Sequence, residues 1–138
     1  MQPVKLVQQF KAKAANVFDA WLKPEIVQLW LFKSPVNEII DVDIDPEVGG
    51  RFSILERNEK KEYIDHFGKY LVINRPERLV FSLKAPKYFS GETRVSVQID
   101  EAPGGCLLTF TQTGVEPEKT QTNWPDMFKQ LRMVLEAK

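Results

Sequence analysis

Alternating apolar and polar positions run through the middle of the chain, from about residue 38 to residue 113. Apolar side chains at every second position are typical of strands with one face on a core. Short clusters rich in Gly, Pro and Asn separate these runs, as expected for hairpin turns. The sequence therefore predicts six successive strands with inward-facing residues Ile40/Val42/Ile44, Phe52/Ile54, the run from about 62 to 73, Leu79/Phe81/Leu83, Val95/Val97/Ile99 and Leu108/Phe110.

Helical spacing appears on both sides of this block. A first strand is predicted over 4–10, followed by a short helix from Ala14 that ends before Pro24. A second short helix opens at Pro24, because proline has no donor to lose in a first turn, and Ser34-Pro35 stops it. Apolar residues from Trp124 to Leu135 form the stripe of a closing helix. Helices segregated from a run of hairpins predict an α+β fold, a curved antiparallel sheet wrapped around the last helix.

Length and charge limit the class of protein. The 138 residues carry 19 basic and 19 acidic side chains, so we expect one domain over 1–138 and no nucleic-acid partner. No apolar run approaches the roughly 20 residues of a membrane span, and the start has no signal-peptide pattern. The single cysteine, Cys106, fits a small buried hydrophobe in a reducing compartment. We therefore expect a cytoplasmic protein.

Motifs for metal, nucleotide or nucleophilic chemistry are missing from the sequence. The acidic run at 41–47 resembles the start of a calcium loop, but Pro46 and Phe52 occupy the positions that need Gly and Glu. Strand alternation explains the run as a solvated face, and contact with a basic partner is the alternative. His66 is the only histidine, which excludes a multi-histidine site. We expect no metal, no cofactor and no catalytic constellation.

Aromatic residues are abundant at the inward positions, where they indicate either a close-packed core or the walls of an apolar cavity. Three polar residues also lie at inward-facing positions of the alternation, and they favour the interpretation as a cavity. Glu56 follows Phe52 and Ile54, Gln112 follows Phe110, and His66 shares a face with Ile64, Gly68, Tyr70 and Val72. A buried polar group needs a partner, so these three are candidate ligand anchors. Positions at strand ends would instead leave them in water. The candidate ligand-binding residues are Trp30, Phe52, Ile54, Glu56, His66, Tyr70, Phe81, Phe110, Gln112, Trp124 and Phe128.

Several local motifs recur in an order and spacing that resemble a known family. These are Val17–Trp21 with Pro24-Glu25, Trp30, Val48–Phe52, Gly68–Tyr70, Arg75–Phe81, Leu107–Gly114, and Asn123-Trp124 ahead of Phe128 and Leu131. Together they resemble the START-like (SRPBCC) superfamily, in the branch named after the activator of the heat-shock protein 90 ATPase. The likeness covers nearly the whole chain. Two departures are Gln112, where the family often has histidine, and Asn123, where it often has glycine.

The resemblance implies the helix-grip fold, a curved sheet that grips the last helix around an apolar cavity. Related members bind lipids and hormones, cyclise polyketides, protect against toxins or assist chaperones, so the fold alone does not set one activity. We expect non-enzymatic binding of a small hydrophobic or amphipathic ligand. The alternatives are a chaperone partner, as the family name suggests, and a cavity-based enzyme such as a cyclase or hydrolase that uses His66 or Glu56 as a base.

Overall fold

The computed structural model describes residues 3–88, 91–114 and 123–136. The predicted order of elements is confirmed. Strand β1 and two short helices are followed by six more strands and helix α4. The bounds are β1 Val4–Phe10, α1 Ala14–Asp19, α2 Pro24–Trp30, β2 Glu38–Ile44, β3 Arg51–Arg57, β4 Tyr63–Asn74, β5 Arg78–Leu83, β6 Thr93–Ala102, β7 Gly105–Thr113 and α4 Asn123–Glu136.

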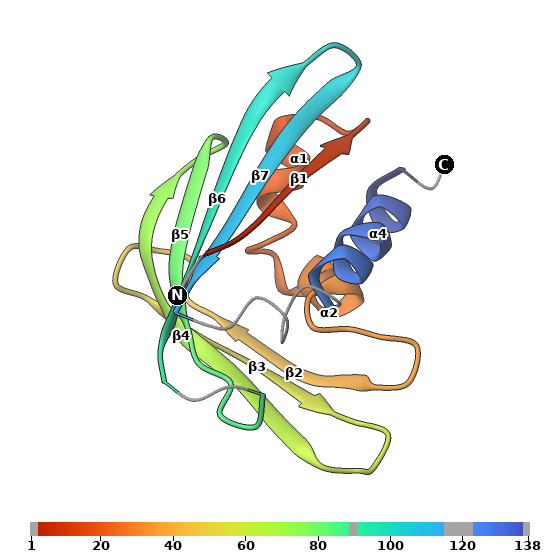
Figure 1. Cartoon of the computed structure of the whole chain (residues 1–138), viewed down its shortest axis with the longest axis vertical. Helices are drawn as coiled ribbons and strands as arrows, with labels where there is room; N and C mark the ends of the chain where they lie inside the picture. Colours follow the sequence, from red (N-terminus) through yellow and green to blue (C-terminus); the bar gives the residue numbers. More distant parts are fainter. Residues whose placement is uncertain (1–2, 89–90, 115–122, 137–138) are drawn as a thin grey trace.

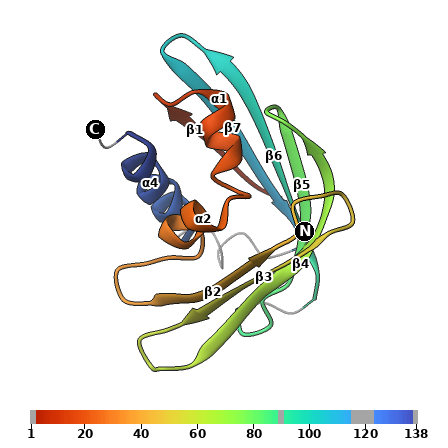
Figure 2. The same ribbon diagram turned by 180° about the vertical axis from the view of Figure 1, so that it is seen from behind.

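The seven strands form one antiparallel sheet in the order β1-β7-β6-β5-β4-β3-β2. The first strand pairs with the last, Leu6 opposite Phe110, so β1 and β2 are the two edges. The sheet is strongly curved, and α1, α2 and α4 all lie on its concave side (Figures 1 and 2). This arrangement is the predicted helix-grip fold, because the closing helix lies in the hollow of the sheet.

The concave face of the sheet and the helices enclose an aromatic core. Trp21 and Trp30, at and beside the short helices, meet edge to face with ring centroids 4.7 Å apart. Phe128 of α4 stacks on Trp30 at 6.1 Å. Burial of such large side chains is the main stabilising contribution at this end of the molecule. Cys106 is also buried and free, as a small core residue.

Strand β4 departs from regular alternation at two places. A side chain at Gly68 would collide with the backbone of Ser82 on β5, so only glycine allows this close approach of the strands. A register shift then occurs between Tyr70 and Val72. The bulge turns Val72 away from the face of Tyr70, leaving it 36% exposed. The prediction that Val72 shares the face of His66 is therefore wrong.

Strand β2 follows the predicted alternation only from Asp41 onwards. A register shift between Ile39 and Asp41 leaves Ile40 44% exposed, so the prediction that Ile40 faces inward is wrong. Asp41, Asp43 and Asp45 are exposed, while Val42 and Ile44 between them are partly buried. Within residues 3–88, 91–114 and 123–136, no cluster of three His, Cys, Asp or Glu side chains is arranged to hold a metal ion. In the same part of the chain, no helix is long and apolar enough to cross a membrane.

Candidate functional site

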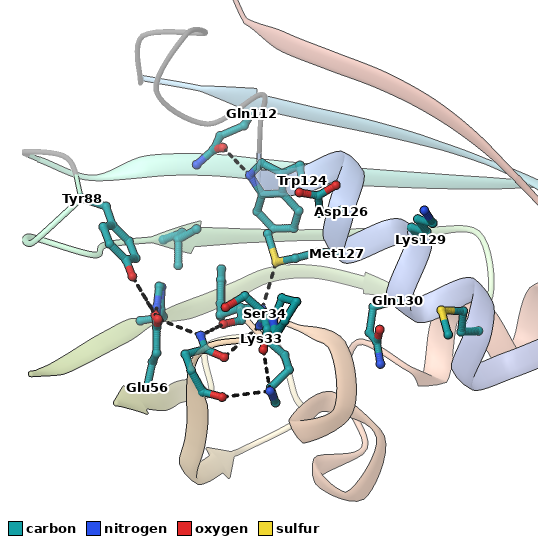
Figure 3. Close-up of a pocket in the computed structure, with 16 residues that line it drawn as sticks. Lys33, Ser34, Glu56, Tyr88, Gln112, Trp124, Asp126, Met127, Lys129 and Gln130 are labelled. Atoms are coloured by element: carbon teal, nitrogen blue, oxygen red, sulfur yellow. Dashed lines mark hydrogen bonds and ion pairs between the residues drawn. The ribbon is translucent and has the colours of Figure 1, made fainter. Parts of the chain in front are cut away.

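A pocket of about 680 Å³ opens between α4, the segment Phe32–Asn37 and the concave ends of the strands (Figure 3). Its volume lies in the range of small-molecule sites. The lining combines apolar and polar side chains from both ends of the chain. The lining residues are Phe32, Lys33, Ser34, Pro35, Asn37, Glu56, His66, Leu83, Tyr88, Gln112, Trp124, Asp126, Met127, Lys129, Gln130 and Met133.

Glu56 and His66 reach the pocket from neighbouring strands. Ile54 pairs with His66 and Glu56 with Ile64, which makes Glu56 and His66 diagonal neighbours on the concave face. Both side chains are buried, with exposed fractions of 4% and 2%. Glu56 Oε1 lies 2.9 Å from His66 Nε2. Strand alternation thus brings a carboxylate and an imidazole into direct contact inside the fold.

Two further donors complete the surroundings of the Glu56 carboxylate. Asn37 Nδ2 donates to Oε2 at 2.7 Å, and the Tyr88 hydroxyl lies 3.0 Å from both oxygens. Burial by itself would raise the pKa of Glu56, but the hydrogen bonds from His66, Asn37 and Tyr88 outweigh it and lower the pKa. Glu56 is therefore an ionised, buried carboxylate. Burial and the charge of Glu56 raise the pKa of Tyr88, which keeps its hydroxyl a donor.

The imidazole of His66 is held by ring contacts as well as by its hydrogen bond to Glu56. Phe32 stacks on its face with centroids 3.9 Å apart and planes 6° apart, and the Tyr88 ring lies 5.6 Å away. Because an ionised carboxylate can only accept, Nε2 must carry the hydrogen of the bond to Glu56. The other ring nitrogen, Nδ1, is buried and has no hydrogen-bond partner among the described residues.

A second polar chain joins α4 to the sheet. Trp124 Nε1 donates to Gln112 Oε1 at 3.0 Å, and Gln112 Nε2 donates to Thr93 Oγ1 at 3.1 Å. Thr93 in turn donates to the carbonyl of Leu83 at 2.9 Å. Gln112 is fully buried, so each polar group of its amide is used internally. These linked hydrogen bonds fix the start of α4 and the orientation of the Trp124 indole at the pocket wall.

The segment Phe32–Asn37 forms the opposite wall and is held by its own polar contacts. Asn37 Nδ2 also donates to the carbonyl of Phe32 at 2.8 Å, and Asn37 Oδ1 accepts from the Ser34 amide at 2.8 Å. The Lys33 ammonium donates to the carbonyls of Ser34 and Asn37. The Phe32 amide meets Met127 Sδ of α4 at 2.9 Å. Asn37 therefore links the wall to the Glu56 carboxylate.

The predicted site residues divide into two groups. Glu56, His66, Gln112 and Trp124 line the pocket. The other seven are buried in the aromatic core and are not among the lining residues. Their contact with a ligand stays a prediction. They are Trp30, Phe52, Ile54, Tyr70, Phe81, Phe110 and Phe128.

Sequence reasoning did not place Phe32, Asn37 or Tyr88 beside the anchors. Phe32 lies at φ 60°, a backbone region that periodicity cannot indicate for a bulky side chain. Asn37 follows Ser34-Pro35 closely, and such a run of turn-forming residues is the one local signal that its side chain caps the turn. Tyr88 lies in the connection between β5 and β6, where alternation carries no information.

Charges around the pocket balance. The lining contains two lysines, Lys33 and Lys129, and two carboxylates, Glu56 and Asp126. The Lys33 ammonium is engaged by backbone carbonyls, so it offers no free charge pair to Glu56. Trp124, Met127, Met133 and Leu83 supply an apolar stretch beside this polar end. The lining thus combines an apolar stretch with a polar end.

Comparisons with known proteins place this arrangement in a family. The model of the family described as "Activator of Hsp90 ATPase homolog 1-like protein" matches residues 11–136. No curated protein matches the chain in sequence. A solved structure from Chromobacterium violaceum superimposes with a TM-score of 0.88 at 20% identity, over 97% of this chain and 96% of its own. The solution structure of an AHSA1-like protein from Aeromonas hydrophila gives 0.82 at 22% identity, over 99% and 93%. A protein of unknown function from Staphylococcus aureus gives 0.80 at 17% identity, over 99% and 94%.

Proposed function

We propose a binding function for this chain, which belongs to the family of Activator of Hsp90 ATPase homolog 1-like proteins: its pocket holds a small amphipathic molecule and releases it unchanged. The family's START-like fold supports a ligand-binding domain in general. The observation that carries the proposal is the pocket of about 680 Å³, with an ionised carboxylate network at one end and apolar side chains beside it.

The ligand's apolar body packs along Trp124, Met127 and Met133 of α4. Removing that body from water supplies the affinity, at about 25 cal/mol per Å² of buried apolar surface. Its polar group faces the end formed by Glu56, His66 and Tyr88, which sets the orientation. A few placed polar groups in an otherwise apolar pocket usually provide this kind of specificity.

The state of Glu56 supports binding without turnover through this carboxylate. Its two oxygens already receive hydrogen bonds from Asn37, His66 and Tyr88, and its pKa is lowered. Such a carboxylate is a weak base, because a general base works best with a pKa near the operating pH. Assistance to a chaperone rests on the family name alone, and no side-chain arrangement in the described residues favours it over the pocket. A chaperone partner and a cytoplasmic location stay predictions.

A titration with the neutral fluorescent probe N-phenyl-1-naphthylamine tests the proposal. Gln130→Trp places a large ring in the pocket lining, and we expect it to weaken probe binding about tenfold or more. Gln28→Trp is the matched control, the same change at an exposed position of α2 outside this pocket. Equal affinities for both variants and the unmodified chain would contradict binding in this pocket.

A further inference from the structure

His66 Nδ1 is a buried polar atom that the fold leaves without a partner. The residue is 2% exposed, and the atom has no hydrogen-bond partner among the described residues. Buried nitrogen atoms in proteins are nearly always bonded, because an unmade bond costs about 1–3 kcal/mol. Around this atom the other polar groups, Glu56, Asn37 and Tyr88, are fully engaged with one another. The structure therefore contains one unused hydrogen-bonding position beside the pocket.

The chemistry of that position follows from its neighbour. Glu56 is ionised, because its hydrogen bonds lower its pKa despite burial, so it accepts the Nε2 hydrogen of His66. A neutral imidazole has only one such hydrogen, which leaves Nδ1 with a free lone pair. The ring cannot turn over to exchange its nitrogens without breaking the bond to Glu56. In the neutral ring Nδ1 is accordingly held as an acceptor.

The position is next to the pocket but covered by two aromatic side chains. His66 is a lining residue, and the side chains over and beside its ring, Phe32 and Tyr88, line the same pocket. Tyr88 is 44% exposed, and Phe32 has the left-handed φ of 60° that bulky residues rarely adopt. Both side chains therefore separate the imidazole from the pocket. A ligand in the pocket reaches Nδ1 when one of them shifts.

The charges around the position select against anions. Glu56 lies 2.9 Å from the same ring, and Tyr88 and Asn37 point their donors at Glu56 rather than into the pocket. Of the pocket's cations, Lys33 is bonded to carbonyls, and Asp126 offsets Lys129 in the lining. An anionic group at Nδ1 would face a negative neighbour and an acceptor together.

We propose that His66 Nδ1 accepts a hydrogen bond from a hydroxyl or N–H group of the bound molecule, so that the pocket selects neutral amphipathic ligands carrying such a donor. This inference rests on the proposed binding function and specifies its ligand class. Glu56 acts here as a positioning residue that holds the His66 tautomer.

The test compares two probes that differ in one donor, 2-naphthol and 2-methoxynaphthalene, at about pH 7.5. We expect 2-naphthol to bind about five- to tenfold more tightly, the effect of one hydrogen bond. His66 is the only histidine, so the imidazole ¹⁵N spectrum reports this ring alone. The Nδ1 resonance is expected to move with 2-naphthol and much less with its methyl ether.

Two variants separate the hydrogen bond from mere packing. His66→Phe keeps a ring beside Phe32 and is expected to abolish the difference between the probes. Glu56→Gln presents an amide donor to Nε2, so the ring hydrogen moves to Nδ1. In the ¹⁵N spectrum Nδ1 then gives the signal of a protonated nitrogen and Nε2 that of an unprotonated one. In that variant the preference for 2-naphthol is expected to disappear even though His66 is still present.

Each outcome bears on a different claim. Equal affinity of the two naphthalenes for the unmodified chain, with Nδ1 unmoved, would overturn the donor inference and leave pocket binding intact. Failure of both naphthalenes and of N-phenyl-1-naphthylamine to bind would overturn the inference together with the proposed function. A preference for 2-naphthol that survives in both variants would assign the hydroxyl to another residue and also overturn the inference.

Discussion

The two ends of the concave face are built from the same strands and packed in opposite ways. On β3, Phe52 and Ile54 belong to the closed core, whereas Glu56, the next inward residue, faces the pocket. At the core end Trp21 and Trp30 meet at 4.7 Å. At the pocket end about 680 Å³ is open, and hydrogen bonds to Glu56 hold the side chains together with the stacking of Phe32 on His66.

This difference shows that alternation along a strand decides which side chains point inward but not whether the space above them is filled. The filling depends on what the helices place there. Trp21 and Trp30 sit over the core end. The segment Phe32–Asn37 and the exposed residues of α4, such as Lys129, border the other end. The helices and the segment before β2 therefore decide where the hollow lies, whereas the sheet supplies Glu56 and His66 beside it.

The largest expected effect lies at the core end. Trp30→Ala removes a fully buried ring, its contact with Trp21 and its hydrogen bond to the Ala20 carbonyl. We expect a loss of about 3–5 kcal/mol in the free energy of unfolding, measured by urea denaturation. Met133→Ala, at a pocket residue that is 59% exposed, should change it by about 0.5 kcal/mol or less. Similar losses for both variants would contradict the division into a packed and an open end.

The next effect concerns the buried carboxylate. Glu56→Ala leaves donors of Asn37, His66 and Tyr88 without their acceptor, and we expect the free energy of unfolding to fall by about 2–3 kcal/mol. Glu56→Gln retains an oxygen and an amide at the same place and should lose less. Urea denaturation of both variants gives the two free energies of unfolding to compare. A Glu56→Ala variant as stable as the unmodified chain would mean that the network contributes nothing.

The pH dependence of stability tests the charge state of Glu56. Its pKa in the folded chain is lowered from the usual 4.5. Ionised Glu56 therefore makes its full contribution to the free energy of unfolding above that value, and this contribution is lost as the pH falls through the folded pKa. We expect the stability difference between the unmodified chain and Glu56→Gln to shrink on acidification below about pH 4.5 and to be constant near neutrality. A difference that grows on acidification would show a raised pKa instead.

The smallest effect belongs to the polar chain at the start of α4. Trp124→Phe keeps most of the ring but leaves the Gln112 carbonyl oxygen without a donor, so we expect a loss of about 1–2 kcal/mol in urea denaturation. Replacing both groups, with Trp124→Phe and Gln112→Leu, should recover part of that loss, because the unbonded oxygen is then gone. If the double variant loses more free energy of unfolding than the two single variants lose together, the role given to this bond is contradicted.

Much of the fold follows from local patterns. Alternation and turn residues predict each strand, and Pro24 predicts the start of α2. The same phase predicts that Glu56, His66 and Gln112 point inward, and the structure buries all three. The bulge after Tyr70 breaks the phase, which is why Val72 faces outward.

The rest of the site depends on contacts between distant segments. Asn37 and Tyr88 reach Glu56 from positions 19 and 32 residues away in the chain, through a turn and a loop that have no periodicity. The split between Trp124, at the pocket, and Trp30, in the core, is equally invisible to periodicity, since both are apolar residues at helical spacing. These features are set by how α4, the segment 32–37 and the connection that carries Tyr88 pack on the sheet.

One spectrum compares the two regions directly, because each of the three tryptophans contributes one indole N–H signal. Trp124 lines the pocket, and Trp30 is fully buried in the core. On titration with N-phenyl-1-naphthylamine we predict the largest shift at the Trp124 indole signal and the smallest at that of Trp30. A shift at Trp30 as large as that at Trp124 would place the ligand inside the aromatic core and contradict the account.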